Sequence, residues 1–184
     1  LGREGHASYV LSNKSGSLAS KSKYCKGEII VDSSNNHAFI QAMIRYNISC
    51  ILPVGINSFK RFYKLKNILA EKDIFCPIAD EKSFEVCISK YQTFQLAEKL
   101  HIPVPKTIHL NNDNVGNVEK EFDYPCVLKA EQELGGSIVK YIYQAEAVQA
   151  IIKETLQEYP GMEISDFILQ EFVEGEGYGF FARS

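Results

Sequence analysis

The segment YPCVLKAEQELGGSIVKYI, residues 124–142, contains two apolar runs separated by a turn of small residues. This pattern predicts a strand, a turn and a second strand. Successive side chains of a strand point to opposite faces, so Cys126 and Leu128 share one face. Val127 and Lys129 share the other. A lysine near the end of a strand is most often solvated, and Lys129 alone does not distinguish a surface residue from a phosphate ligand.

The turn itself allows two interpretations. Gly135, Gly136 and Ser137 have small side chains, and their backbone N–H groups can approach an anion closely. Gly-Gly-Ser is also common in hairpin turns. The segment is not a P-loop, because it lacks the G-x-x-x-x-G-K-[ST] pattern.

A second apolar strand precedes an acidic stretch in ILQEFVEGEG, residues 168–177. Three acids within six residues are typical of a solvated turn. On a strand edge with unpaired backbone, however, the carbonyl of Glu171 and the N–H of Val173 point the same way. These two groups match the N6 amino group and N1 of an adenine. The carboxylate of Glu176 would then lie near the ribose hydroxyls.

The stretch SKYQTFQLAEKLHIPVPKT, residues 89–107, predicts a helix. Ser89 followed by Gln92 three residues later is typical of a capping box, so Ser89 is the expected N-cap. Two prolines end the helix and lead into a strand, TIHL, at residues 107–110. Lys90 lies in the first turn, where the helix dipole does not favour a cation. It is either an exposed lysine or a residue that reaches a phosphate.

In the N-terminal half, short apolar strands alternate with amphipathic helices. The strands are expected at residues 27–31 and 50–55, and the helices at 37–48 and 58–72. This alternation predicts a parallel sheet with crossover helices. We expect the first strand of the layer to precede Leu1, so that the chain begins inside a domain.

The rest of the chain completes a second unit. The pattern of residues 145–159 predicts a helix with one apolar stripe. Residues 166–184 predict two strands around a polar turn, and we expect the second of these strands to be incomplete. The predicted organisation is an α/β domain at residues 1–84 and part of an α+β domain at residues 85–184.

Composition limits the classes of function. The chain has 184 residues, of which 45% are hydrophobic, with a net charge of −3 and no long apolar run. A membrane span is therefore not expected, and nor is a dedicated nucleic-acid binder, which would carry a basic stripe. The five cysteines are scattered without a C-x-x-C pair, which favours reduced thiols of a cytoplasmic protein over a zinc site or disulfides.

The order of these segments resembles the ATP-grasp superfamily with its preceding α/β domain. The most similar types are the carbamoyl-phosphate-synthase large chain and the carboxylate–amine ligases. The resemblance covers nearly the whole chain, and the segments that carry it are LGREGH, CILPVG, SKYQTFQLAEKLHIPVPKT, YPCVLKA with GGS, and ILQEFVEGEGYG.

The resemblance implies a Rossmann-like pre-ATP-grasp domain followed by the first part of an α+β ATP-grasp domain. It also implies roles for individual residues. They are ATP phosphate contacts for Lys90 and Lys129, a lid over the phosphates for Gly135, Gly136 and Ser137, adenine backbone contacts for Glu171 and Val173, a ribose contact for Glu176, and a place near the adenine amino group for Gln170.

The implied cofactors are ATP and Mg²⁺, and the implied reaction activates a carboxylate as an acyl phosphate that an amine or other nucleophile attacks. Small-molecule carboxylates and amines are the implied substrates, and a homo-oligomer is compatible with the family. The metal ligands are expected beyond Ser184, so the chain alone is expected to be inactive. The sequence departs from the family pattern at Ser89, where an aspartate is usual, and at Ala130, where proline is common.

Two other classes stay open. A non-catalytic nucleotide-binding or regulatory module could retain the same fold. A plain dinucleotide-binding α/β domain is less favoured, because no G-x-G-x-x-G follows a predicted strand.

Overall fold

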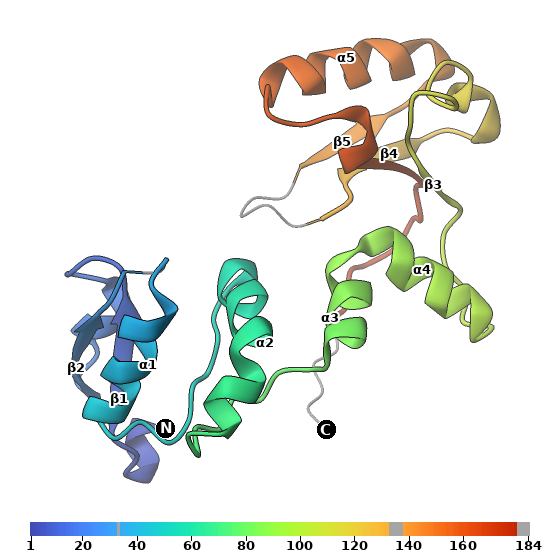
Figure 1. Cartoon of the computed structure of the whole chain (residues 1–184). Helices are drawn as coiled ribbons and strands as arrows, with labels where there is room; N and C mark the ends of the chain where they lie inside the picture. The colour runs from blue at the N-terminus through green and yellow to red at the C-terminus, as the bar shows by residue number, and fades with distance from the viewer. Residues whose placement is uncertain (33, 133–137, 180–184) are drawn as a thin grey trace. The chain divides into compact units, whose positions relative to one another are not determined.

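The computed structural model of the chain describes residues 1–32, 34–132 and 138–179. Contacts between residues divide the chain into two compact units (Figure 1). The first comprises Leu1–Val54 with Ser58–Ile78, and the second comprises Gly55–Asn57 with Ala79–Ser184.

The first unit is a mixed layer of strands and helices. Strands β1 (Ser8–Ser12) and β2 (Cys25–Ile30) form a two-stranded parallel sheet. Helices α1 (Asn36–Arg45) and α2 (Ile56–Ala70) follow. The predicted helices and the strand at 27–31 are therefore present, and the parallel pairing agrees with the predicted alternation. A Rossmann-like arrangement stays a prediction.

The predicted strand at residues 50–55 is wrong within the described structure. An isolated parallel bridge joins Cys50 to Phe75 instead, with the Ile51 N–H donating to the Phe75 carbonyl at 2.8 Å. The segment still contributes to the core through Ile51, which packs with residues of both helices. The buried core of this unit consists of Ile29, Phe39, Met43, Ile51, Phe62, Leu65, Leu69, Ile74, Cys76 and Ile78.

The second unit contains a four-stranded antiparallel sheet in the order β3-β6-β4-β5. Its elements in chain order are α3 (Glu81–Ile88), α4 (Lys90–Lys99), β3 (Thr107–His109), β4 (Cys126–Ala130), β5 (Val139–Ile142), α5 (Val148–Glu158) and β6 (Phe167–Glu171). Strands β4 and β5 form the hairpin predicted from residues 124–142. The predicted division between residues 84 and 85 falls inside α3.

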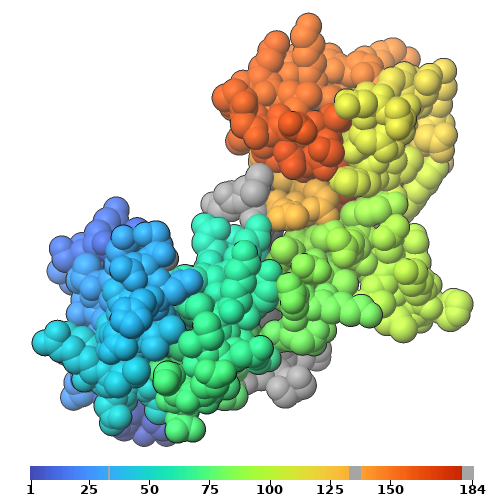
Figure 2. Space-filling view, in the orientation of Figure 1, coloured from blue at the N-terminus to red at the C-terminus, as the bar shows by residue number. Residues whose placement is uncertain are grey.

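Helix α5 lies across one face of this sheet (Figure 1). Cys126 and Leu128 point into the core beneath it, as the alternation predicted. In the space-filling view the side chains of α5 (orange) lie against those of the segment that follows β3 (yellow) (Figure 2). The shared contacts include Val118, Phe122, Val148 and Ile152, and they close this side of the sheet.

The structure differs from the sequence-based expectation at both ends of the second unit. Helix α3 was not predicted, although Asp80 caps it by accepting a hydrogen bond from the Ser83 N–H at 3.0 Å. A second strand was predicted within residues 166–184, but residues 172–179 contain none and the remainder lies outside the described residues.

The described cysteines are free thiols, and no two of them form a disulfide. Cys76 and Cys126 are buried, and burial raises the pKa of the Cys126 thiol to about 11. Cys50 and Cys87 are exposed, so the expectation of core thiols holds for only part of the set.

Candidate nucleotide-binding site

The first turn of α4 is fixed to the end of β4. Ser89 is the N-cap, as predicted, because its side chain accepts a hydrogen bond from the Gln92 N–H at 3.0 Å. The Ser89 hydroxyl also donates to the carboxylate of Glu131, and the Lys90 N–H donates to the Glu131 carbonyl at 3.1 Å. These bonds place the first-turn lysine next to the strand that carries Lys129.

The open face of the sheet, opposite α5, carries a short hydrogen-bonded relay. Lys129 Nζ donates to Gln170 Oε1 at 2.6 Å, and Gln170 Nε2 donates to Thr107 Oγ1 at 2.8 Å. Since a lysine can only donate, its contact fixes which end of the amide carries the oxygen. Gln170 is only 3% exposed. The two contacts give both ends of its buried amide a hydrogen-bond partner, as buried polar groups require.

Lys129 lies in an unfavourable environment for a cation. Burial lowers the pKa of its ammonium group, and the positive charge of Lys90 lowers it further. The ion pairs in the described part of the chain are Lys106–Glu121 and Lys140–Glu158, both solvent-exposed. Neither Lys90 nor Lys129 has a carboxylate partner there, so the two charges repel each other without local compensation.

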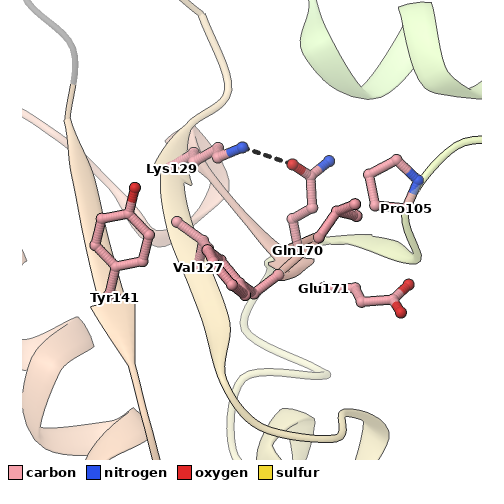
Figure 3. A pocket seen from close by; sticks show the side chains of 8 residues that line it. Pro105, Val127, Lys129, Tyr141, Gln170 and Glu171 are labelled. Carbon is pink, nitrogen blue, oxygen red and sulfur yellow. Dashed lines mark hydrogen bonds between the residues drawn. The ribbon is translucent and has the colours of Figure 1, made fainter. Parts of the chain in front are cut away.

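A cavity of about 220 Å³ opens on this face of the sheet (Figure 3). The residues that line it are Pro105, Val127, Lys129, Tyr141, Gln170, Glu171, Phe172 and Val173. Apolar side chains form one part of the lining, with the Tyr141 and Phe172 rings edge-to-face at 5.9 Å between centroids. The lysine and amide form the other part. The cavity therefore combines aromatic and apolar side chains with one lysine and one buried amide.

The end of β6 provides backbone groups at the same cavity. The Glu171 N–H donates to the Lys106 carbonyl at 2.8 Å, and the Glu171 carboxylate accepts from the Lys106 N–H at 3.1 Å. The Lys106 N–H donates to the Glu171 side chain and not to the Glu171 carbonyl. Regular backbone pairing between β6 and the segment before β3 therefore ends at Glu171. Within the described residues, neither the Glu171 carbonyl nor the Val173 N–H has a backbone partner. Both residues line the cavity.

The structure thus brings together several residues singled out from the sequence. Lys129, Gln170, Glu171 and Val173 line one cavity, and Lys90 lies close enough to Lys129 to affect its pKa. Their individual roles toward a nucleotide stay predictions.

Four of the residues singled out from the sequence remain. Glu176 is not among the lining residues, and its carboxylate accepts a hydrogen bond from the Tyr178 hydroxyl at 2.9 Å. Its ribose contact stays a prediction. Gly135, Gly136 and Ser137 lie outside the described residues, and their lid role is likewise a prediction.

Sequence reasoning missed the apolar lining and Thr107. The register of the β4–β5 hairpin sets Val127 opposite Tyr141, so both lie on the Lys129 face. Alternation had already placed Val127 on the Lys129 face, and the hairpin pairing would in turn have indicated Tyr141. Thr107 pairs with Gln170 across strands far apart in sequence, and no local signal indicated it.

The described residues hold no group of three or more histidine, cysteine, aspartate or glutamate side chains placed to bind a metal. The Mg²⁺ ligands expected beyond Ser184 stay a prediction. None of the described helices is long and apolar enough to cross a membrane.

No protein-family model matches the chain. Among curated proteins it is similar to the D-aspartate ligase of Enterococcus faecium (strain Aus0004), with 26% identity over 176 residues, 84% of this chain and 41% of that protein. It is also similar to the formate-dependent phosphoribosylglycinamide formyltransferase of Sulfurisphaera tokodaii, with 24% identity over 106 residues, 56% of this chain and 26% of that protein. The chain therefore spans less than half the length of these relatives.

Solved structures share the fold. The biotin carboxylase domain of Hydrogenobacter thermophilus 2-oxoglutarate carboxylase, in complex with MgADP, ADP and bicarbonate, matches with a TM-score of 0.67 and 16% identity, over 94% of this chain and 40% of that chain. The N5-carboxyaminoimidazole ribonucleotide synthetase of Thermus thermophilus matches with a TM-score of 0.65 and 15% identity, over 94% and 42%. Both are ATP-grasp proteins, so this chain has an ATP-grasp fold and the resemblance inferred from its sequence is confirmed.

Proposed function

We propose that this chain supplies the nucleotide-binding part of an ATP-dependent ligase. The observation that carries the proposal is the pair Lys90 and Lys129, two neighbouring cations without a carboxylate partner in the described structure, beside a cavity with an apolar lining. Two uncompensated lysines are stabilised when a polyphosphate supplies the missing negative charge.

The base of the nucleotide is adenine. Its flat ring fits against Tyr141 and Phe172, and the backbone groups at the end of β6 and just beyond it meet its edge. The Glu171 carbonyl accepts from the N6 amino group, and the Val173 N–H donates to N1. Guanine would set its O6 acceptor against the Glu171 carbonyl and its N1–H donor against the Val173 N–H. Both backbone groups would then be left unpaired, so guanine is rejected.

The reaction is transfer of the γ-phosphoryl group to a carboxylate. The resulting acyl phosphate is attacked by an amine or another nucleophile, and phosphate leaves. Phosphoryl transfer depends mainly on positioning and charge neutralisation, which are the properties that Lys90 and Lys129 provide. Mg²⁺, when bound with ATP, would neutralise part of the phosphate charge, and the described residues contain no cluster of side chains placed to hold it.

The relatives support this class of reaction by their names, since one is a D-aspartate ligase and the other uses formate. The chain matches less than half of each relative. The ligase activity is therefore proposed for the full-length protein that contains this chain, as a cytoplasmic enzyme that can be a homo-oligomer. The 184 residues alone are expected to bind nucleotide without turnover.

The test is ATP turnover by the full-length protein in a screen of small carboxylates and amines, with released phosphate as the readout. The ligase predicts release that requires both a carboxylate and a nucleophile and that Lys129→Met abolishes. Lys140→Met is the matched control, because Lys140 lies on the neighbouring strand and pairs with Glu158 on α5. Turnover unchanged in Lys129→Met contradicts the phosphate role of Lys129. Nucleotide binding without turnover under any condition would favour the non-catalytic module.

A further inference from the structure

Glu131 joins β4 to α4 through both its backbone and its side chain. Its carboxylate accepts from the Ser89 hydroxyl, and its carbonyl accepts from the Lys90 N–H. An isolated antiparallel bridge between Ser89 and Gln132 extends the connection. One residue thus holds two consecutive residues that lie far from it in sequence.

The Glu131 connection is buried. Glu131 is 8% exposed and Ser89 is 4% exposed. A buried carboxylate is costly unless hydrogen bonds satisfy it, so its position next to the first turn of α4 is well defined. Water competes little for the Ser89 hydroxyl there, and the bond resists small rotations of the helix.

A second contact holds the same turn from another side. The Tyr91 ring stacks on His109 of β3, with 5.2 Å between centroids and 26° between planes. His109 is held in turn by its Nε2, which lies 2.7 Å from the Ser165 carbonyl. The residues before and after Lys90 are therefore both anchored to the sheet, and Lys90 lies between them.

Two like charges remain close only when the surrounding structure holds them. Burial lowers the pKa of Lys129, and the positive charge of Lys90 lowers it further, as expected for like charges near each other. Without an anchor, a small rotation of α4 would separate the two ammonium groups and relieve that repulsion. A site held in the paired arrangement before binding loses less free energy when it orders around a phosphate.

We propose that Glu131 is a positioning residue that holds Lys90 beside Lys129, so that both lysines reach the same polyphosphate. Glu131 itself does not contact the nucleotide. This role rests on the proposed function, since it acts through the phosphate-facing lysines.

The first experiment measures ATP and ADP affinity of the chain by calorimetry for variants at positions 89 and 131. Glu131→Ala removes the carboxylate and weakens binding about tenfold. Ser89→Asp sets two carboxylates against each other and weakens binding by a similar factor, while it keeps an N-cap acceptor. Combining Ser89→Asp with Glu131→Gln restores affinity to within about threefold of wild type, because the new amide donates to the new carboxylate. If the combined variant binds as weakly as Ser89→Asp, the positioning role is wrong.

The second experiment asks whether Glu131 acts through Lys90. Glu131→Ala is combined with Lys90→Met and, separately, with Lys129→Met. The positioning role predicts that the effect of Glu131→Ala disappears in the Lys90→Met background and persists at about tenfold beside Lys129→Met. A purely structural effect lowers affinity equally in both backgrounds and overturns the inference. Thermal midpoints of all variants show whether any of them has lost its fold, and the paired substitutions at 89 and 131 remain informative if Glu131→Ala does not fold.

These outcomes separate the two proposals. If the wild-type chain and the full-length protein bind neither ATP nor ADP, the proposed function fails and the role of Glu131 fails with it. If the wild type binds and Lys90→Met weakens binding while Glu131→Ala does not, the nucleotide site stands and only the positioning role is wrong.

Discussion

The ammonium group of Lys129 donates a 2.6 Å hydrogen bond to Oε1 of Gln170, a neutral amide whose own N–H group donates to Thr107. The amide orients the lysine without neutralising it. A carboxylate at this position would compete with a phosphate for the same charge. The relay therefore leaves the charge of Lys129 uncompensated, as the proposed phosphate contact requires.

Loss of the Thr107 hydroxyl should destabilise the second unit. Thr107→Val leaves the buried Nε2 of Gln170 without an acceptor, which costs about 1–3 kcal/mol. Urea unfolding measures the change, and Thr107→Ser is the matched control because it keeps the hydroxyl. Equal stability of the valine and serine variants would contradict the relay.

The contribution of Lys129 to the free energy of unfolding should rise with pH. Burial and Lys90 lower the pKa of this lysine in the folded state, so between that pKa and the unfolded value near 10.5 the unfolded chain binds more protons. Folding is then favoured as pH increases through this window. The difference in unfolding free energy between wild type and Lys129→Met should shift in favour of wild type as the pH rises from the lowered pKa toward the unfolded value.

The pKa of Lys140 is shifted in the opposite direction from that of Lys129, so Lys140 serves as a comparison. The hydrogen bond to Glu158 raises the pKa of Lys140, so its small contribution is present at neutral pH and is lost as pH rises through the raised value. Lys140→Met should therefore not reproduce the shift seen with Lys129→Met. A pH dependence in the same direction for both would contradict the environment assigned to Lys129.

Nucleotide binding should be coupled to proton uptake. A phosphate beside Lys129 favours its charged form and raises its pKa from the lowered value, so a fraction of the chains takes up a proton on binding at alkaline pH. Calorimetry of ADP binding at about pH 9 in buffers of different ionisation enthalpy measures the number of protons. Uptake should decrease in Lys129→Met, and uptake unchanged in that variant would place the titrating group elsewhere.

The base contact should depend on the backbone of Val173. Val173→Pro removes the N–H that meets N1 of adenine and should weaken ADP binding about tenfold. Val173 is 64% exposed, so the substitution disturbs little packing. Val173→Ala retains the N–H and is the control. ADP should bind more tightly than GDP to the wild type, and the proline variant should lose this preference. Equal affinity of wild type for both nucleotides would contradict the proposed base contacts.

Local signals in the sequence predicted the parts of the site that are locally determined. The cap at Ser89, the two faces of β4 and the spacing of Glu171 and Val173 depend on residues a few positions apart, and the first two are confirmed. Lys90 and Lys129 lie on α4 and β4, which are distant in sequence and are joined by hydrogen bonds at Glu131 that no local pattern contains. Only the resemblance to the ATP-grasp superfamily predicted that Lys90 and Lys129 contact the same ligand.

The errors have similar causes. The apolar run at residues 50–55 reads as a buried strand, but only Cys50 finds a bridge partner, Phe75, in the described structure. Pairing depends on a neighbouring strand, which the run itself does not specify. Helix α3 is only eight residues long, so its periodic pattern is too short to predict a helix even with an N-cap at Asp80. The strand order β3-β6-β4-β5 joins segments that are distant in sequence, so pattern alone does not predict it.

The central claim is that Lys90 and Lys129 face one polyphosphate. The most direct test is calorimetric titration of Mg·ATP and ADP into the 184-residue chain and the full-length protein, each as wild type, Lys90→Met, Lys129→Met and Lys140→Met. We predict binding by the wild type, weakened about tenfold or more by either of the first two substitutions and unchanged by the third. Binding that is absent from the full-length wild type, or that is insensitive to both Lys90→Met and Lys129→Met, would contradict the claim.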